Sequence, residues 1–333
     1  MISEGHPGDR RVLQQPVAPP ITLPATRLLL DSGTIQISKG GSTAGINPQG
    51  AVVRSWKVEG RELLFSHPNP ENRLRASHPI GPMCGMLYDP VTRERNGLHV
   101  IDGVSVKMPL HGGLREENWS QASKRSGDEA VLELSNVPGS PPTEMAKHYP
   151  FNYLWRLGVE LPTDKKLVWD LSYTGLSEGR KAPVDMGWHL YLPFEQGMKI
   201  EGLNGLRYDD LTAWDAPAEG TILGPGAFGD RINRDWQIRL KSGPDGRPRT
   251  EFAITYPAAG YSLKMKLLSD RADTMIVWSN PVLGIGDFIC PELWRGERNS
   301  WKKGTAEQVG FNEKAGLRIE LEYVPGKAVA AKG

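Results

Sequence analysis

Two histidines of the chain lie in settings that could do chemistry. His111 precedes two glycines in "VKMPLHGGLREENW", and His189 lies within the apolar and aromatic run "PVDMGWHLYLPF". A buried imidazole is costly unless it is paired or functional. The two glycines after His111 leave room for a ligand or for another stretch of backbone. The alternative for each histidine is a structural role, in which backbone groups satisfy its ring nitrogens.

A carboxylate in similar surroundings occurs late in the chain. Glu292 lies between an apolar run and a tryptophan in "GIGDFICPELWRGERNSW". Apolar surroundings shift the pKa of a carboxylate, which is typical of a general base. The alternative is an ion pair with Arg295 or Arg298. Glu292 with His111 and His189 would form an acid–base set, and the motifs around them contain no lysine or serine with the signature of a nucleophile.

The elements that must position these side chains are predicted to be strands. Short runs alternate apolar with polar residues at period two, as half-buried strands do. They cover residues 34–40, 51–60, 131–137, 152–161, 166–176, 236–243, 251–257, 261–270, 274–281 and 317–325. Turn residues fill the gaps, and no long stretch has helical periodicity. The pattern predicts an all-β protein built as a large antiparallel β-sandwich.

The two ends of the chain differ from its body. Residues 1–26 are polar and rich in proline, and they lack the apolar core of a signal peptide. We expect them to form an N-terminal arm. Nothing within residues 27–326 marks a linker, so this range is predicted to be a single β-sandwich catalytic domain. Residues 327–333 are predicted to be a C-terminal tail.

Charge and composition exclude several classes of protein. Lys and Arg number 40 and Asp and Glu number 39, so no excess charge would attract nucleic acid or an acidic membrane. The sequence has no apolar run of the length that spans a membrane, about 18 residues. Cys84 and Cys290 are too few and too far apart in sequence for a disulfide framework or a zinc site. We expect a cytoplasmic protein, although a periplasmic one could also carry two free thiols.

Six motifs follow one another along the chain. They are "GAVVRSWKVEGRELLF" (50–65), "NGLHVIDGVSVKMPLHGG" (96–113), "HYPFNYLWRLGVEL" (148–161), "PVDMGWHLYLPF" (183–194), "FICPELWRGERNSWKKG" (288–304) and "GFNEKAGLRIELEYVP" (310–325). In this order they resemble the galactose mutarotase (aldose 1-epimerase) superfamily. Each motif is short, but the ordered set covers nearly the whole chain. The resemblance implies the galactose mutarotase-like supersandwich and a sugar 1-epimerase that needs no metal or other cofactor.

The resemblance also implies roles for the candidate residues. His111 matches the histidine that helps to hold the sugar and its ring oxygen, His189 matches the general acid and Glu292 matches the general base. Arg93 best matches the substrate-binding arginine. Asp235 is our choice for the substrate-binding aspartate, with Asp230 as a near competitor. Three tryptophans flank the motifs and could either stack on a sugar ring or pack in the core: Trp188, Trp294 and Trp301.

Some positions depart from the family pattern. Trp188 stands where the classical sugar mutarotases have asparagine, and the run after Glu292 differs from theirs. These departures favour a divergent branch and leave the sugar, and any phosphate on it, open. The expected partner is a small sugar or sugar derivative, and the expected assembly is a monomer or homodimer. Two alternatives remain: a non-catalytic carbohydrate-binding protein, and a lyase or hydrolase that processes glycosides.

Overall fold

The structure is a computed structural model that describes residues 33–67, 76–87, 97–101, 103–195, 197–203, 207–208, 235–240, 249–279 and 288–326. It is 54% strand and 6% helix, which confirms the predicted all-β class. No helix in these ranges is long and apolar enough to cross a membrane. The predicted arm and tail, residues 1–26 and 327–333, lie outside the described residues, so the division of the chain stays a prediction.

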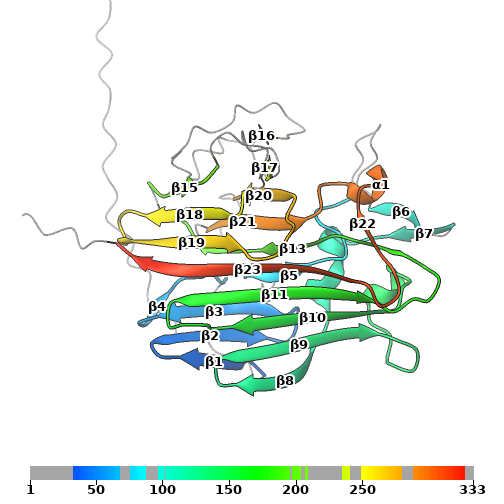
Figure 1. Cartoon of the computed structure of the whole chain (residues 1–333), viewed down its shortest axis with the longest axis horizontal. Coiled ribbons are helices and arrows are strands. Elements are labelled where there is room, and N and C mark those ends of the chain that lie inside the picture. Colours follow the sequence, from blue (N-terminus) through cyan, green and yellow to red (C-terminus); the bar gives the residue numbers. More distant parts are fainter. Residues whose placement is uncertain are drawn as a thin grey trace, which may run out of the picture.

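An eight-stranded antiparallel sheet forms one layer (Figure 1). Its strands, in spatial order, are β15 (Lys199–Glu201), β18 (Glu251–Tyr256), β19 (Tyr261–Leu267), β23 (Lys314–Pro325), β11 (Lys166–Gly175), β10 (Tyr153–Glu160), β9 (Glu129–Asn136) and β8 (Ser120–Ser126). The longest of them, β23, pairs with both β11 and β19 and so joins the two halves of the sheet.

Two sheets together form the second layer. The first has the order β1 (Ile35–Lys39), β2 (Ser42–Asn47), β3 (Val52–Val58) and β4 (Arg61–Glu62). The second has the order β16 (Arg207–Tyr208), β17 (Asp235–Arg239), β20 (Thr274–Trp278), β21 (Phe288–Arg295), β13 (Met186–His189) and β5 (His78–Ile80), and β14 (Leu192–Pro193) also pairs with β21. A bridge between Val53 and Ser77 connects the two sheets.

The remaining elements are short. Two separate two-stranded sheets are β6 (Leu98–Ile101) with β7 (Val104–Lys107), and β12 (Ala182–Val184) with β22 (Glu307–Val309). β6 and β7 pair antiparallel, with Ile101 opposite Val104. Three helices of one or two turns complete the description: η2 (Leu110–Glu116) and η3 (Met145–Lys147), both 3-10 helices, and α1 (Ser300–Lys303).

The main core lies between the two layers. Burial alternates along β23, where Leu317, Ile319 and Leu321 are fully buried. Trp169 of β11 stacks on Trp188 of β13 across the layers, with ring centroids 5.1 Å apart. A fully buried aliphatic or aromatic side chain of this kind stabilises the fold by about 1.5–3 kcal/mol. The alternation that predicted the strands is therefore the alternation that fills the core.

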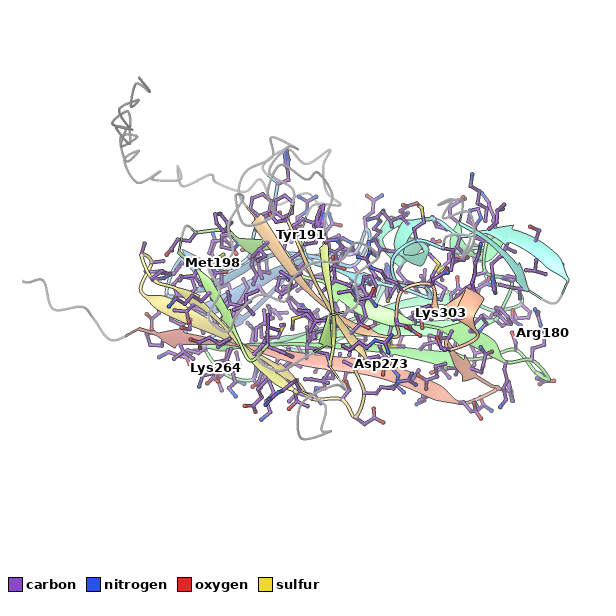
Figure 2. The ribbon with its side chains drawn as sticks, turned by 90° about the horizontal axis from the view of Figure 1, so that it is seen from above. Arg180, Tyr191, Met198, Lys264, Asp273 and Lys303 are labelled. Atoms are coloured by element: carbon purple, nitrogen blue, oxygen red, sulfur yellow. The ribbon has the colours of Figure 1, made fainter. Side chains whose placement is uncertain are left out.

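The second layer is buried on both of its faces around β13 and β21. Every residue of β13 is buried, and so are all of β21 except Arg295. One face packs into the main core, and the other carries two smaller apolar clusters that include Trp294 and Tyr191. In Figure 2 the side chains of Tyr191 and Lys264 lie toward opposite sides of the molecule, and Lys264 belongs to β19. This second face of β13 and β21 holds the candidate site.

Candidate active site

Strand pairing brings His189 beside Glu292. In the register of β13 with β21, Gly187 pairs with Trp294 and Trp188 with Leu293, so the next residues along are His189 and Glu292. Nε2 of His189 lies 3.3 Å from Oε1 of Glu292. Both side chains are almost fully buried. The two residues that the sequence placed in an acid–base set are therefore in direct contact.

His111 reaches the same place from the 3-10 helix η2. Its backbone adopts φ of +60°, and the two glycines after it also have positive φ. At Gly112 a Cβ atom would lie 2.3 Å from the carbonyl oxygen of Gly81, so only glycine allows these two backbone segments to touch. The glycine after His111 therefore accommodates another backbone segment, which is one of the two alternatives that the sequence left open.

A backbone hydrogen bond fixes the ring of His111. The N–H of Gly85 donates to Nδ1 of His111 at 3.1 Å, so Nδ1 has no proton and Nε2 carries it in the neutral ring. The ring lies edge-on to that of His189, with centroids 5.3 Å apart. Burial lowers the pKa of His111 well below its usual value, and Arg115 lowers it further. His111 thus presents a neutral Nε2–H donor.

Burial also shifts the pKa values of the contacting pair. It raises the pKa of Glu292 to about 8, against smaller opposing effects of a hydrogen bond from Trp294 and the charge of Arg115. Burial lowers the pKa of His189 well below its usual value, and His78, His111 and Arg115 lower it further. Both shifts favour the uncharged forms. At neutral pH the free pair therefore holds one proton, closer to Glu292 than to His189.

Trp294 holds the second oxygen of Glu292. Its indole N–H donates to Oε2 at 3.0 Å, and both residues are on the same face of β21. Gly187 on the neighbouring strand makes room for the indole, because a Cβ there would lie 2.6 Å from the Trp294 ring. The sequence left open an ion pair of Glu292 with Arg295. That arginine instead binds Glu307, at 2.6 and 2.9 Å.

Arg115 is a charged residue of the site that the sequence did not single out. It lies in η2, four residues after His111, and its side chain is mostly buried. Its charge lowers the pKa values of His111, His189 and Glu292. Its place in the sequence motif around His111, four residues after that histidine, could have marked Arg115 as a candidate site residue.

The sequence analysis also passed over His78. This residue opens β5, is completely buried and pairs with His189 across the strands. The two imidazoles stack with centroids 5.0 Å apart and an interplanar angle of 24°. Like His189, it stands beside an apolar run in the sequence, so the same criterion would have selected it. The pairing of β5 with β13 is what places it in the site.

For Trp188 the sequence left two roles open, stacking on a sugar ring and packing in the core. It precedes His189 on β13, and successive side chains of a strand point to opposite faces. Its ring is 1% exposed and packs in the main core against Trp169. Trp188 therefore belongs to the core. Strand alternation within "GWHLY" was the signal that could have separated Trp188 from His189.

Aromatic rings form one side of the site. Tyr191 stacks on His189 with centroids 4.7 Å apart, and Trp278 of β20 meets His189 edge-on at 5.6 Å. Phe65 lies beside Tyr191, with centroids 6.4 Å apart. Trp278 and Phe65 are half-buried, so part of each ring is exposed. The sequence analysis did not select any of the three.

Comparison with known proteins identifies the family of the chain. A family model described as aldose 1-epimerase matches residues 33–304. The chain belongs to the aldose 1-epimerase family. The chain is also similar to solved structures that share its fold. A protein from Synechocystis sp. PCC 6803 matches with a TM-score of 0.71 and 17% identity, covering 88% of this chain and 96% of that one.

Two proteins from Lactobacillus acidophilus are similar over comparable lengths. A galactose mutarotase related enzyme matches with a TM-score of 0.70 and 15% identity, covering 89% of this chain and 98% of that one. A galactose 1-epimerase from strain NCFM matches with a TM-score of 0.66 and 15% identity, covering 88% and 95%. At these identities the likeness shows the fold, which is the galactose mutarotase-like sandwich that the sequence predicted.

The other residues expected to bind sugar in this aldose 1-epimerase family member have mixed outcomes. Arg93 and Asp230 lie outside the described residues. The backbone of Asp235 begins β17 and pairs with Trp278, and its side chain is outside the description. Trp301 of α1 contacts His99 and Tyr149. For Arg93 and Asp235, sugar binding stays a prediction.

The close approach of three ligand-type side chains raises the question of a metal ion in this family member. The donor atoms of His111, His189 and Glu292 all lie within 4.8 Å of one another. A metal on Nε2 of His111 would move the ring proton to Nδ1, where it would oppose the N–H of Gly85. The charge of Arg115 would also repel a cation. The donor set therefore fits proton transfer better than metal binding.

Proposed function

We propose that the protein interconverts the α and β anomers of an aldose or an aldose derivative. The observation that carries this proposal is the 3.3 Å contact between Nε2 of His189 and Oε1 of Glu292. The C1 hydroxyl oxygen and the ring oxygen of a cyclic sugar are bonded to the same carbon. A base for the first and an acid for the second must therefore lie within a few ångströms of each other, and each must be within hydrogen-bond reach of its oxygen.

The reaction needs one proton in the pair and returns it. In the reacting form Glu292 is a carboxylate and His189 is protonated. Glu292 takes the proton from the C1 hydroxyl, the bond between C1 and the ring oxygen breaks, and His189 gives its proton to that oxygen. The product is an open-chain aldehyde, and the pair is now uncharged. Rotation about the C1–C2 bond and the reverse proton transfers close the ring with the opposite configuration at C1.

The neighbours of Glu292 favour the carboxylate that the first step requires. Burial alone would keep the proton on Glu292. The indole N–H of Trp294 and the charge of Arg115 both stabilise the carboxylate. The proton can pass directly to His189 across the 3.3 Å contact when the sugar binds. His111, which carries its proton on Nε2, donates a hydrogen bond to a sugar oxygen in this scheme.

The aromatic side of the site suits a sugar ring. Trp278 and Phe65 are half-buried beside the Tyr191–His189 stack. An aromatic face packs well against the C–H groups of a pyranose, and we propose that Trp278 takes this role. Arg93 and Asp235 are retained as proposed sugar-binding residues on the strength of the family resemblance.

The proposed setting is a reducing cytoplasm, with a small sugar as the partner. Cys84 and Cys290 are both buried free thiols, which agrees with that setting. No excess charge attracts nucleic acid, because the formal net charge is +1. A monomer or homodimer remains the expected assembly.

Proton NMR of pure anomers tests the proposal. A panel of neutral, acidic and phosphorylated aldoses is followed with and without the protein, and the exchange rate between anomers is measured. We expect catalysed exchange for at least one sugar. A reducing-end assay with oligosaccharides runs in parallel. New reducing ends without anomer exchange would support the lyase or hydrolase alternative, and sugar binding without either reaction would support the binding-protein alternative.

A further inference from the structure

His78 has a buried hydrogen-bond acceptor without a partner. Its Nδ1 lies 2.8 Å from the carbonyl oxygen of Ala76, and a carbonyl only accepts, so Nδ1 carries the proton. Burial lowers the pKa of His78 to about 3, and the ring is therefore neutral, with a bare lone pair on Nε2. Among the described residues nothing donates to this nitrogen. An unsatisfied buried polar atom costs about 1–3 kcal/mol.

Arg115 has a buried donor without a partner. Its Nε makes no hydrogen bond to any described residue. Oε1 of Glu116 lies 3.8 Å from this nitrogen, beyond hydrogen-bond reach, and Glu116 is half exposed. Leu114, the residue before Arg115, donates its backbone N–H to the carbonyl of Gly81 at 3.4 Å, and Gly81 directly follows β5, which His78 opens. The unpaired donor and the unpaired acceptor are thus carried by two segments, η2 and β5, that pack against each other at the site.

Only some chemical groups can satisfy both atoms. A carboxylate or phosphate oxygen accepts from an arginine but has no proton for the lone pair of His78. An ammonium group donates to His78 but is repelled by Arg115. A hydroxyl does both, because its oxygen accepts from Arg115 and its proton goes to Nε2 of His78.

We propose that His78 and Arg115 together bind one hydroxyl of the sugar, and that they select a substrate with a neutral hydroxyl at that carbon. The inference rests on the proposed function and refines its substrate class. The stacking of His78 on His189 places this hydroxyl next to the reacting end of the sugar. Sugars that carry a carboxylate, a phosphate or an amine at that position are disfavoured.

Binding of methyl glycosides tests the proposal independently of the reaction, because these sugars cannot open their rings. The probes are the methyl glycosides of glucose and galactose and their monodeoxy analogues, each lacking one hydroxyl, titrated by calorimetry. We expect removal of one particular hydroxyl to weaken binding by about tenfold or more, since it leaves both protein atoms unpaired. If every monodeoxy analogue binds as well as its parent, a water molecule satisfies the two atoms and the proposal is overturned.

Substitutions of His78 and Arg115 test whether these two residues bind that hydroxyl. His78→Phe keeps an aromatic ring against His189 but removes the acceptor, and Arg115→Gln removes the charge. Each should weaken binding of the parent glycoside about tenfold and leave binding of the critical deoxy analogue almost unchanged. Equal losses on both probes would overturn the proposal. His99→Phe is the matched control, because His99 contacts Trp301 outside the acid–base set, and it should change neither affinity.

The two hypotheses fail in different ways. If the protein binds the methyl glycosides with this hydroxyl dependence but exchanges no anomers, the proposed function is wrong and the subsite stands. If it exchanges anomers and prefers sugars with an anionic group at the critical carbon, the subsite is wrong and the function stands. Should His78→Phe not fold, Arg115→Gln and the wild-type deoxy series still decide.

Discussion

His189 and Glu292 lie on adjacent antiparallel strands with Nε2 and Oε1 3.3 Å apart, in a site where both are almost fully buried. Burial disfavours a charge on either group, so at neutral pH the free pair holds one proton, which is on Glu292. A sugar that presents a hydroxyl to one and a ring oxygen to the other would let this proton move through the substrate.

Removing either member of the pair should stop the reaction. Glu292→Gln keeps the volume and polarity of the side chain but removes the proton acceptor, so kcat should fall by at least about a hundredfold. His189→Asn should have a similar effect. The double variant should lose much less than the product of the single losses, because the two groups act in one proton relay. Anomer exchange by NMR measures all three, and near-wild-type rates in Glu292→Gln would refute the assignment.

The pH dependence of kcat/KM should be bell-shaped, with burial deciding which group forms each limb. With their ordinary pKa values, the carboxylate would form the acidic limb and the imidazolium the alkaline limb. Because the pKa of Glu292 is raised to about 8, the pair loses its proton and activity falls above that pH. Because the pKa of His189 is lowered, the pair gains a second proton only at a pH well below the usual pKa of histidine, and activity falls there. The limbs belong to the coupled pair, and an alkaline limb near pH 10 would contradict this account.

Trp294→Phe should move the alkaline limb. The substitution removes the N–H that donates to Oε2 of Glu292 at 3.0 Å, so the carboxylate loses a stabilising bond and its pKa rises further. We expect the alkaline limb of the kcat/KM profile to shift to higher pH, while the acidic limb changes little. Equal shifts of both limbs would instead indicate a general rearrangement of the site.

Gly112→Ala should destabilise the protein more than Gly60→Ala. Both glycines have φ of +80°, so alanine suffers the same backbone strain at each, roughly 1–2 kcal/mol. At Gly60 a Cβ would meet nothing within 4 Å, whereas at Gly112 it would lie 2.3 Å from the Gly81 carbonyl. The free energy of unfolding in urea should show an additional loss of about 1–3 kcal/mol for Gly112→Ala. Equal losses would show that the contact with Gly81 can relax.

Asp185→Asn should flatten the pH dependence of stability. Asp185 is buried between β12 and β13, accepts a hydrogen bond from the hydroxyl of Ser300, and has its pKa raised by burial to about 8. Between its usual value of 3.8 and about 8 the folded state binds a proton that the unfolded state has lost, so stability falls as pH rises, by up to about 1.4 kcal/mol per pH unit. Thermal melts between about pH 5 and pH 8, which lie within that window, should show the melting temperature falling more steeply with pH for the wild type than for Asp185→Asn.

The sequence by itself predicted six of the eight strands of the large sheet and selected the candidate acid–base set. β10 and β23 are buried on one face only, so their apolar residues alternate and period two is visible without a structure. β13 and β21 are buried on both faces, so alternation disappears and periodicity does not mark them as strands. His189 and Glu292 were nevertheless found, because an ionisable residue inside an apolar run is conspicuous.

Tertiary structure decided the rest of the site. His78 and Trp278 enter it because β5 and β20 pair in the same sheet as β13 and β21, and Arg115 enters it because η2 folds back against Gly81. Trp188, next to His189 in the sequence, is excluded because it faces the core. The local sequence indicates which residues a strand contains. Which strand it pairs with, and which of its faces is buried, depend on contacts between segments far apart in the chain. Neighbours in space are therefore determined only when the sheets have formed and packed.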